Sequence, residues 1–584
     1  MPLGRSMAGP VMSPPRPDYP RPQFARDRWL NLNGQWTCTL DAPPEADLAG
    51  ATGFECPIVV PFCPEAPLSG IGHTDFIETL WYHRAFVVPA DWTGARVWLN
   101  FGGVDWHATV YVDGRRAGEH WGGAAAFRID LTPYVTPGAS HDLVVRVEDR
   151  TASGLQPCGK QSRERDSHGC YYTRVTGIWQ TVWLEPVDPM GLESCRIVSD
   201  LDYGRLLLEP VFDEPGRGQR LEATVRAGDT VVASVSVPAR NGIPVPLELN
   251  DVRPWSPVDP FLYDLDLVVR DAAGAAVDVV RSYAGLRTVE VAGDRLLLNG
   301  AETYLRFVLD QGYYPAGVWT APDDAALKRD IELARALGFN GARLHQKVFE
   351  PRFHYWADRL GYLTWAEAPS WGFDENDAQA TRNFLSEWRE IVAQVRNHPS
   401  VIAWTPLNET VRDAVGPEHR RFVADVYDLT RALDPTRPVN DASGWHHVKT
   451  DLWSVHAYDQ DPAAIAAKLT PAPHVFRNYP EHEVAYAGQP YFVDEFGGAK
   501  WVANGEAGEG WGYGEAPETR AAFMARLEGQ VAAVLAQPHV RGYCYTQLTD
   551  VEQEQNGLYT YARAPKFDAD ALRAVFSREP GAAD

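Results

Sequence analysis

The 584-residue chain lacks the patterns of disulfide-rich, cysteine-metal and membrane-spanning proteins. Its seven cysteines form an odd, scattered set without a C-x-x-C pair or a Cys/His ligand spacing, so a reducing compartment is the simplest setting. No stretch approaches the ~20 apolar residues that cross a bilayer, and the proline-rich N-terminus has no apolar run of signal-peptide length. We therefore expect a cytoplasmic protein in which residues 1–25 form a disordered leader.

Positive charge is also scarce. The chain has 54 basic and 78 acidic residues, a net charge of −24, and no local Lys/Arg-rich run. Such a chain repels phosphate backbones and anionic membrane surfaces. The phosphate loop G-x-x-x-x-G-K-[ST], the zinc motif H-E-x-x-H and a Rossmann glycine triplet are all missing. We expect no nucleic acid, no membrane partner, no cofactor and no metal, and we leave homo-oligomerisation open.

Aromatic residues, in contrast, are plentiful: 20 Trp, 24 Tyr and 22 Phe. The more common role of any single one is in a β-rich core, which favours aromatic side chains. At the rim of a barrel an aromatic ring has a second use, because its face stacks on the axial C–H groups of a sugar. Trp371 and Trp511 are our candidates for that role, and the Gly-rich acidic loop 505–515 is either a flexible surface loop or a lid.

The first half of the chain has the pattern of two antiparallel β-sandwiches. Short segments of alternating apolar and polar residues, such as ATVYVDG, are separated by Gly, Pro, Asp or Asn. They cover residues 26–188, and a second all-β stretch with LYDLDLVVR covers residues 189–288. About a hundred residues with this many short strands fit an immunoglobulin-like sandwich, although no Cys…Trp…Cys signature is present.

Residues 289–584 have a different pattern, in which apolar runs alternate with amphipathic helical segments about eight times. The alternation predicts a TIM barrel, whose strands are covered on both faces and are therefore almost continuously apolar. Polar side chains stand at or just past these strands, at the end where barrel active sites lie. They are Asp310, Arg343, His345, Glu367, Asn408, Glu409, His456, Glu495 and Gln547.

Glu409 and Glu495 are the best candidates for a catalytic pair. Both end strongly apolar strands, VIAWTPLNE and YFVDEF, which we count as strands four and seven. Cleavage of a glycoside needs one protonated and one ionised carboxyl group across a sugar ring, and a retaining enzyme places them ~5–5.5 Å apart. Either residue alone is equally well explained as a salt-bridged or capping side chain.

The sequence segments around both glutamates resemble those of glycoside hydrolase family 2. NHPSVIAWTPLNE resembles its acid/base segment, and FVDEFGG resembles its nucleophile segment. NLNGQW and GIWQTVWLEP look like its sugar-binding jelly roll, and YAGLRTVEV looks like its junction between an immunoglobulin-like domain and the barrel. The resemblance extends over nearly the whole chain. It implies a jelly roll, an immunoglobulin-like sandwich and a C-terminal TIM barrel, in that order.

The resemblance also implies roles for individual residues. It matches Glu409 to the acid/base, Glu495 to the nucleophile and Asn408 to the neighbour that binds the sugar 2-hydroxyl. Its substrate-facing arginine and its supports of the nucleophile match Arg343, His456 and Tyr458. The chain departs from well-known members after strand one (LDQGYYP), after strand two (LHQKV) and at Gln547 after strand eight. These places shape the first sugar subsite, so the departures leave the substrate open.

We therefore expect a retaining exo-glycosidase that removes a terminal non-reducing sugar. A β-D-galactoside, pyranoside or furanoside, is the preferred substrate, because the chain resembles a galactofuranosidase-like branch and a charged Asp310 would repel uronic acids. A β-glucuronidase or β-mannosidase of the same family is the alternative. From other classes, an inactive carbohydrate-binding protein and a metal-dependent barrel hydrolase stay open.

Overall fold

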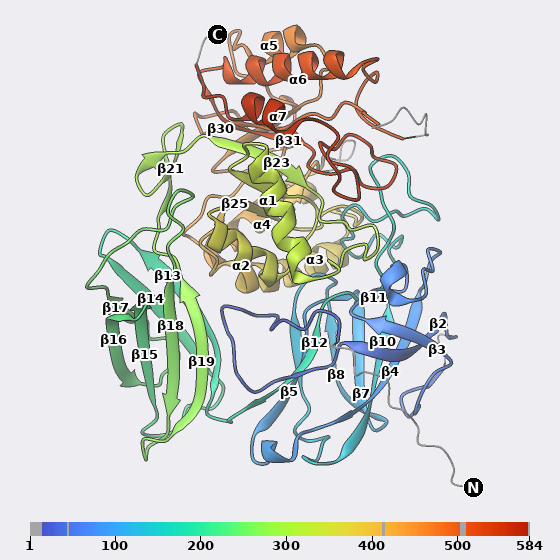
Figure 1. Ribbon diagram of the computed structural model, residues 1–584, viewed down its shortest axis with the longest axis vertical. Coiled ribbons are helices and arrows are strands. Elements are labelled where there is room, and N and C mark those ends of the chain that lie inside the picture. Colours follow the sequence, from blue (N-terminus) through green and yellow to red (C-terminus); the bar gives the residue numbers. More distant parts are fainter. Residues whose placement is uncertain (1–13, 44–45, 411–414, 503–509, 582–584) are drawn as a thin grey trace.

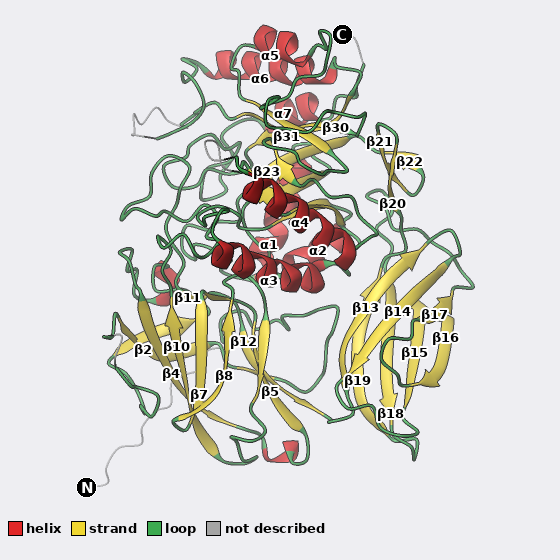
Figure 2. Cartoon of the chain, turned by 180° about the vertical axis from the view of Figure 1, so that it is seen from behind, coloured by secondary structure: helices red, strands yellow, loops and turns green. Residues whose placement is uncertain are grey.

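The structure is a computed structural model that describes residues 14–43, 46–410, 415–502 and 510–581. Two β-sandwiches lie side by side, and a unit of strands and helices lies across one end of both (Figure 1). Seen from behind and coloured by secondary structure, the α-helices gather in that third unit (Figure 2). None of the described helices is long and apolar enough to cross a membrane.

The first sandwich is a jelly roll built from antiparallel ladders. A six-stranded sheet in the order β3-β2-β4-β10-β7-β8 faces a four-stranded sheet in the order β1-β12-β5-β9. Alternate residues of each strand are buried between the sheets, as Leu143, Val145 and Val147 of β10 are. The strands are β1 (Leu30–Asn31), β2 (Gly34–Leu40), β3 (Cys56–Val60), β4 (Thr79–Val87), β5 (Arg96–Phe101), β6 (Val104–Asp105), β7 (His107–Val112), β8 (Arg115–Trp121), β9 (Phe127–Asp130), β10 (Ser140–Glu148), β11 (Gly177–Ile178) and β12 (Val182–Val187).

The second sandwich has the expected immunoglobulin-like shape. A three-stranded sheet, β13-β14-β17, packs on a four-stranded sheet, β16-β15-β18-β19. Leu206 and Leu208 of the first sheet and Leu221 and Leu265 of the second belong to one buried cluster. The strands are β13 (Leu192–Asp200), β14 (Arg205–Phe212), β15 (Arg220–Ala227), β16 (Thr230–Pro238), β17 (Val245–Glu248), β18 (Tyr263–Arg270) and β19 (Ala276–Ala284).

The third unit is the predicted barrel. A small sheet of β20 (Val289–Ala292), β21 (Arg295–Leu298) and β22 (Ala301–Glu302) precedes it. Seven strands then form a curled parallel sheet in the order β26-β25-β24-β23-β31-β30-β29, and the parallel pair β27-β28 adds the short fifth position. The bounds are β23 (Leu305–Asp310), β24 (Gly341–Leu344), β25 (Leu363–Glu367), β26 (Val401–Thr405), β27 (Leu407–Asn408), β28 (Ala442–Ser443), β29 (Trp453–Ala457), β30 (Tyr491–Gly497) and β31 (Val540–Thr546).

The helices of the barrel begin at recognisable caps. Asp323, Asp377, Asp461, Thr519 and Asp568 each accept a backbone N–H bond at the start of a helix, which satisfies donors that have no partner inside the helix. The helices are α1 (Asp324–Ala336), α2 (Pro351–Leu360), α3 (Ala378–Val395), α4 (Pro417–Leu433), α5 (Pro462–Leu469), α6 (Arg520–Leu535) and α7 (Ala569–Phe576).

The segment before β1 corrects the expectation of a disordered leader over residues 1–25. From residue 14 onward it packs against all three units. Arg16 is 5% exposed and pairs with Glu350 of the barrel, and Arg21 pairs with Glu185 of the jelly roll. The backbone of Ala25 bonds to β19 of the second sandwich. Proline content suggested disorder, but the arginines between the prolines form ion pairs with the barrel and the jelly roll. Residues 1–13 lie outside the described residues.

Candidate active site

A cavity of about 610 Å³ opens at the carboxyl ends of the barrel strands. Its walls include eight of the residues that the sequence singled out: His345, Trp371, Asn408, Glu409, His456, Tyr458, Glu495 and Trp511. The other four do not line it: Asp310, Arg343, Glu367 and Gln547. All four are nevertheless buried, at 3% exposed or less.

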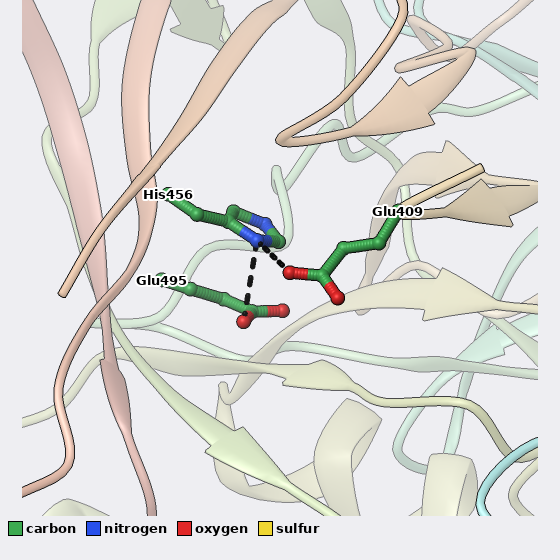
Figure 3. Close-up of side chains that lie close together, drawn as sticks. All are labelled: Glu409, His456 and Glu495. Carbon is green, nitrogen blue, oxygen red and sulfur yellow. Dashed lines mark hydrogen bonds and ion pairs between the residues drawn. The ribbon is translucent and has the colours of Figure 1, made fainter. Parts of the chain in front are cut away.

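Glu409, His456 and Glu495 converge in this cavity (Figure 3). Glu409 directly follows β27 in the left-handed region, with φ 44°, whereas His456 and Glu495 are paired on the neighbouring strands β29 and β30. His456 Nδ1 lies 2.7 Å from Glu409 Oε1 and 3.4 Å from Glu495 Oε2. One oxygen of each carboxylate and one nitrogen of the imidazole all lie within 4.8 Å of one another. An approach of the two nearest oxygens to within this distance is compatible with the ~5–5.5 Å separation of the carboxyl groups in retaining enzymes.

Glu495 is held as a carboxylate. Its burial favours the neutral acid, but His456 and Arg343 outweigh burial and lower the pKa of Glu495 to about 2. Arg343 Nη1 donates to Glu495 Oε1 at 3.1 Å, and the Tyr458 hydroxyl donates to Oε2 at 2.5 Å. An ionised oxygen that faces an open cavity is available for attack on an electrophilic carbon.

Arg343 organises the wall behind the two glutamates. Its guanidinium is fully buried and also donates to Glu367 Oε1 at 2.6 Å, to the Asp494 carbonyl at 2.7 Å and to Asn408 Oδ1 at 3.0 Å. The last bond fixes which way the Asn408 amide points. Asn408 Nδ2 is then a buried donor without a protein partner, and the residue lines the cavity. An unsatisfied buried donor in a cavity wall is suited to a ligand hydroxyl.

His456 lies between the two glutamates and is protonated at neutral pH. Burial lowers the pKa of its imidazole, but Glu495, Asp494 and Glu409 more than offset burial and raise that pKa to about 9. By their spacing the three side chains could also hold a metal ion. A protonated imidazole does not ligate a metal, so at neutral pH the proton competes with that use. The absence of a metal stays a prediction.

Two predicted subsite residues lie elsewhere. Asp310 was expected to meet sugar hydroxyls, but its carboxylate accepts from the Gly312 backbone, and burial, followed by the charge of Asp330, raises its pKa to about 7. It does not line the cavity, and an acid of this pKa carries only part of a charge at neutral pH. Gln547 is fully buried and bonded to Gln311 and Asn556. Of this group only Gln311 lines the cavity.

The jelly roll contributes residues to the cavity that were not predicted from the sequence. Residues 158–173, here called the strap, leave β10 and return to β11, and they bring Lys160, Cys170 and Tyr171 into the cavity wall. In Figure 1 this segment extends from the jelly roll beside the red loops that follow β31. The position of Lys160 in the cavity could not be predicted from the sequence, because an irregular loop has no periodicity that shows where a side chain points.

The strap is fastened to two barrel loops. Cys158 N donates to the Trp371 carbonyl at 2.8 Å, after β25, and Gln553 Nε2, after β31, donates to the strap carbonyls of Gly169 and Tyr171 at 2.9 Å each. Gly159 has φ +59°, and a Cβ there would lie 2.4 Å from the Gln346 carbonyl. The cavity is therefore walled by two domains and not by the barrel alone.

The predicted lid falls partly outside the described residues, because 503–509 are not among them. Of the described part, Trp511 and Tyr513 line the cavity. The ring of Tyr513 stacks on that of Tyr458 with centroids 3.5 Å apart and planes 7° apart. A movement of loop 505–515 stays a prediction.

Three family models match successive parts of the chain. Residues 19–184 match the sugar binding domain of glycosyl hydrolases family 2, residues 214–287 match the model named glycosyl hydrolases family 2, and residues 289–577 match its TIM barrel domain. The three matched ranges follow the jelly roll, the second sandwich and the barrel described above.

Curated relatives are similar over about three fifths of the chain. A β-glucuronidase of Paenibacillus borealis is 26% identical, covering 62% of this chain and 64% of its own length. A β-galactosidase of Thermoanaerobacter pseudethanolicus is also 26% identical, covering 62% of this chain and 48% of its own length. The matched part of this chain thus spans about half to two thirds of these relatives.

Solved structures share the fold over nearly the full chain. A β-glucuronidase from Ruminococcus gnavus in complex with D-glucuronic acid superimposes with a TM-score of 0.79 at 19% identity, covering 95% of this chain and 99% of that chain. A β-D-glucuronidase from Dictyoglomus thermophilum has a TM-score of 0.77 at 21% identity, covering 96% and 99%. At these identities the likeness speaks for the fold alone.

Proposed function

Because the chain belongs to glycosyl hydrolase family 2, we propose that it is a retaining exo-glycosidase with Glu495 as nucleophile and Glu409 as general acid/base. The observation that carries the proposal is a pair of glutamates at the mouth of the barrel whose nearest oxygens lie within 4.8 Å, one of them with a pKa of about 2. Two acids in such unequal surroundings suit a reaction that needs a nucleophile and a proton donor.

In the first step, Glu495 Oε attacks the anomeric carbon while protonated Glu409 gives its proton to the departing oxygen. The aglycone leaves as an alcohol, and the sugar is bound to Glu495 as an ester. Arg343 and Tyr458 hold the attacking carboxylate in place through bonds of 3.1 and 2.5 Å. Asn408 Nδ2 offers its free N–H to a hydroxyl of the same sugar.

In the second step, ionised Glu409 takes a proton from water, and the oxygen of that water displaces Glu495 from the anomeric carbon. His456 Nδ1 lies 2.7 Å from Glu409 Oε1 and orients the carboxyl group that acts as the base. Two inversions at one carbon retain its configuration, so the first product has the anomeric form of the substrate.

For the sugar, we propose a terminal β-D-galactoside, pyranoside or furanoside. One curated relative is named a β-galactosidase, and others are named β-glucuronidases, which makes a β-glucuronide the principal alternative and a β-mannoside the second. The strap supports exo action, because it walls the cavity from the jelly-roll side. A panel of 4-nitrophenyl glycosides assayed with the wild type and with Glu495→Ala tests the proposal. Equal turnover by both proteins would contradict it.

The spacing of Glu409, His456 and Glu495 is the one observation that favours a second candidate, a metal-dependent hydrolase. Dialysis against EDTA distinguishes the metal-dependent hydrolase from the metal-independent glycosidase. We expect unchanged kcat/KM after chelation, since protonated His456 takes part as a cation, whereas a loss that added Zn²⁺ restores would favour the metal enzyme.

A further inference from the structure

Lys160 presents an ammonium group to the cavity from the jelly roll. The residue is 6% exposed, lines the cavity, and holds its Nζ 4.5 Å from the centroid of the Trp371 ring. Among the described residues, no side chain or carbonyl accepts a hydrogen bond from this ammonium. Burial lowers the pKa of Lys160, but Cys170, Glu554 and Glu495 more than compensate and raise it, so the group is a cation. A buried ammonium with three free donors is suited to a bound ligand.

Glu554 lines the same cavity from the loop after β31 and is 2% exposed. The Tyr172 hydroxyl donates to its Oε2 at 2.5 Å, and Asn556 Nδ2 donates to its Oε1 at 3.0 Å. These bonds fix the carboxylate and leave each oxygen with a lone pair to spare. No ion pair within 4.0 Å joins Lys160 to Glu554, so the two described side chains do not satisfy one another.

The charges around the cavity disfavour an anionic sugar. Among the described residues that line the cavity, Lys160 is the one lysine or arginine, and Glu375, Glu409, Glu495 and Glu554 all contribute carboxyl groups. A uronic acid would add a further carboxylate to this set, and in the described part of the wall only Lys160 and His456 are cations. A neutral sugar needs no such compensation, because one hydroxyl accepts from the ammonium and another donates to the carboxylate.

We infer that Lys160 and Glu554 form a clamp, one residue from each domain, that selects an uncharged terminal sugar by binding two of its hydroxyls. The inference rests on the proposed glycosidase function and narrows its substrate to neutral glycosides. It also gives the jelly roll a direct part in specificity, through a residue of the strap.

The test compares the wild type with Lys160→Met and with Glu554→Gln. Methionine is an unbranched side chain of similar length without the charge, and the glutamine amide can still accept from Asn556 and can donate to the Tyr172 hydroxyl. Each protein is assayed on 4-nitrophenyl β-D-galactoside, on the galacturonide and glucuronide, and on a series of mono-deoxy galactosides; melting temperatures confirm folding. We expect the wild type to favour the galactoside over either uronide by about 100-fold in kcat/KM or more.

Lys160→Met should lose about 30-fold or more on the galactoside but less than about 3-fold on the one deoxy analogue that lacks the clamped hydroxyl. Glu554→Gln should raise the ratio of uronide to galactoside turnover. A wild type that prefers a uronide, or a Lys160→Met variant that loses equally on every deoxy analogue, would overturn the clamp.

Calorimetric titration of the same proteins with free D-galactose and D-galacturonate tests sugar binding by the clamp independently of the proposed hydrolysis. Absence of turnover on the whole aryl glycoside panel contradicts the proposed function. If D-galactose still binds in preference to D-galacturonate, and Lys160→Met abolishes that preference, the clamp stands. Equal binding of both sugars overturns it.

Discussion

Replacement of His456 by Gln should raise the pH at which the enzyme loses activity in acid. Activity requires ionised Glu495, and it falls as the pH drops through the pKa of that carboxyl. Burial opposes ionisation, yet the charges of His456 and Arg343 bring the pKa from 4.5 to about 2. This lowering corresponds to about 3 kcal/mol in favour of the carboxylate. His456 is the larger of the two opposing causes, so its loss should move the acidic limb of kcat/KM upward by about one pH unit or more.

The assay is the pH dependence of kcat/KM on an activated aryl glycoside, because this quantity reports the free enzyme and a good leaving group needs little help from Glu409. His446→Gln is the matched control. That imidazole is also fully buried, but burial followed by the charge of His419 lowers its pKa to about 4, so it is uncharged at neutral pH. An acidic limb that stays in place in His456→Gln, or that moves equally in His446→Gln, would refute the electrostatic account of Glu495.

Three further predictions concern the acid, the strap and the domain interface. Glu409→Ala should lose far more rate on glycosides with poor leaving groups than on activated aryl glycosides, and equal losses would mean that Glu409 is not the acid. Gly159→Ala forces a Cβ against the Gln346 carbonyl and should lower kcat/KM about tenfold or more, whereas Gly169→Ala, also at positive φ (+51°) but with open space around it, should not. Glu387 accepts a bond from the jelly-roll backbone at 2.7 Å, and burial raises its pKa to about 7. The folded state therefore keeps a proton that the unfolded chain releases near pH 4.5, so the free energy of unfolding decreases as the pH rises from 4.5 to 7. Glu387→Gln should remove about 3 kcal/mol of that pH dependence, measured as urea midpoints at pH 5 and 8, and an unchanged dependence would contradict the assignment.

The fold could be predicted from the sequence where a periodic pattern reports burial. The alternation of apolar strands with amphipathic helices predicted the barrel, and α3, Ala378–Val395, is one of these amphipathic helices, with its apolar residues buried. The sequence also led to Glu409 and Glu495 as candidates, because each stands at the end of an apolar run, and both line the cavity. The TIM barrel, the two sandwiches and the family are thus confirmed.

Side-chain direction at the end of a strand was harder to predict. Successive residues of a strand point to opposite sides, and Leu309 and Gln311 line the cavity whereas Asp310, between them, does not. The sequence places Asp310 at the end of the barrel where the cavity lies, but it does not show that the Asp310 side chain points away from that cavity. A count of alternation from Leu309 would have found Gln311 instead.

The contribution of the strap depends on contacts between distant parts of the chain. Lys160 reaches the cavity because the strap is bonded to loops that follow it by about 200 and nearly 400 residues. No local pattern encodes such contacts. Glu554 left a clearer signal, as a carboxylate just past strand eight in TQLTDVEQEQNGLY.

The most direct test of the double-displacement account is the anomeric configuration of the glycosyl azide that each of two variants forms from the same activated β-glycoside. In Glu495→Ala, azide occupies the place of the missing nucleophile and attacks once, so the product should be the α-azide. In Glu409→Ala, Glu495 still forms the glycosyl-enzyme and azide attacks second, so the product should be the β-azide. Proton NMR of the anomeric signals distinguishes the two. The same anomer from both variants, or the reverse assignment, would contradict the roles given to Glu495 and Glu409.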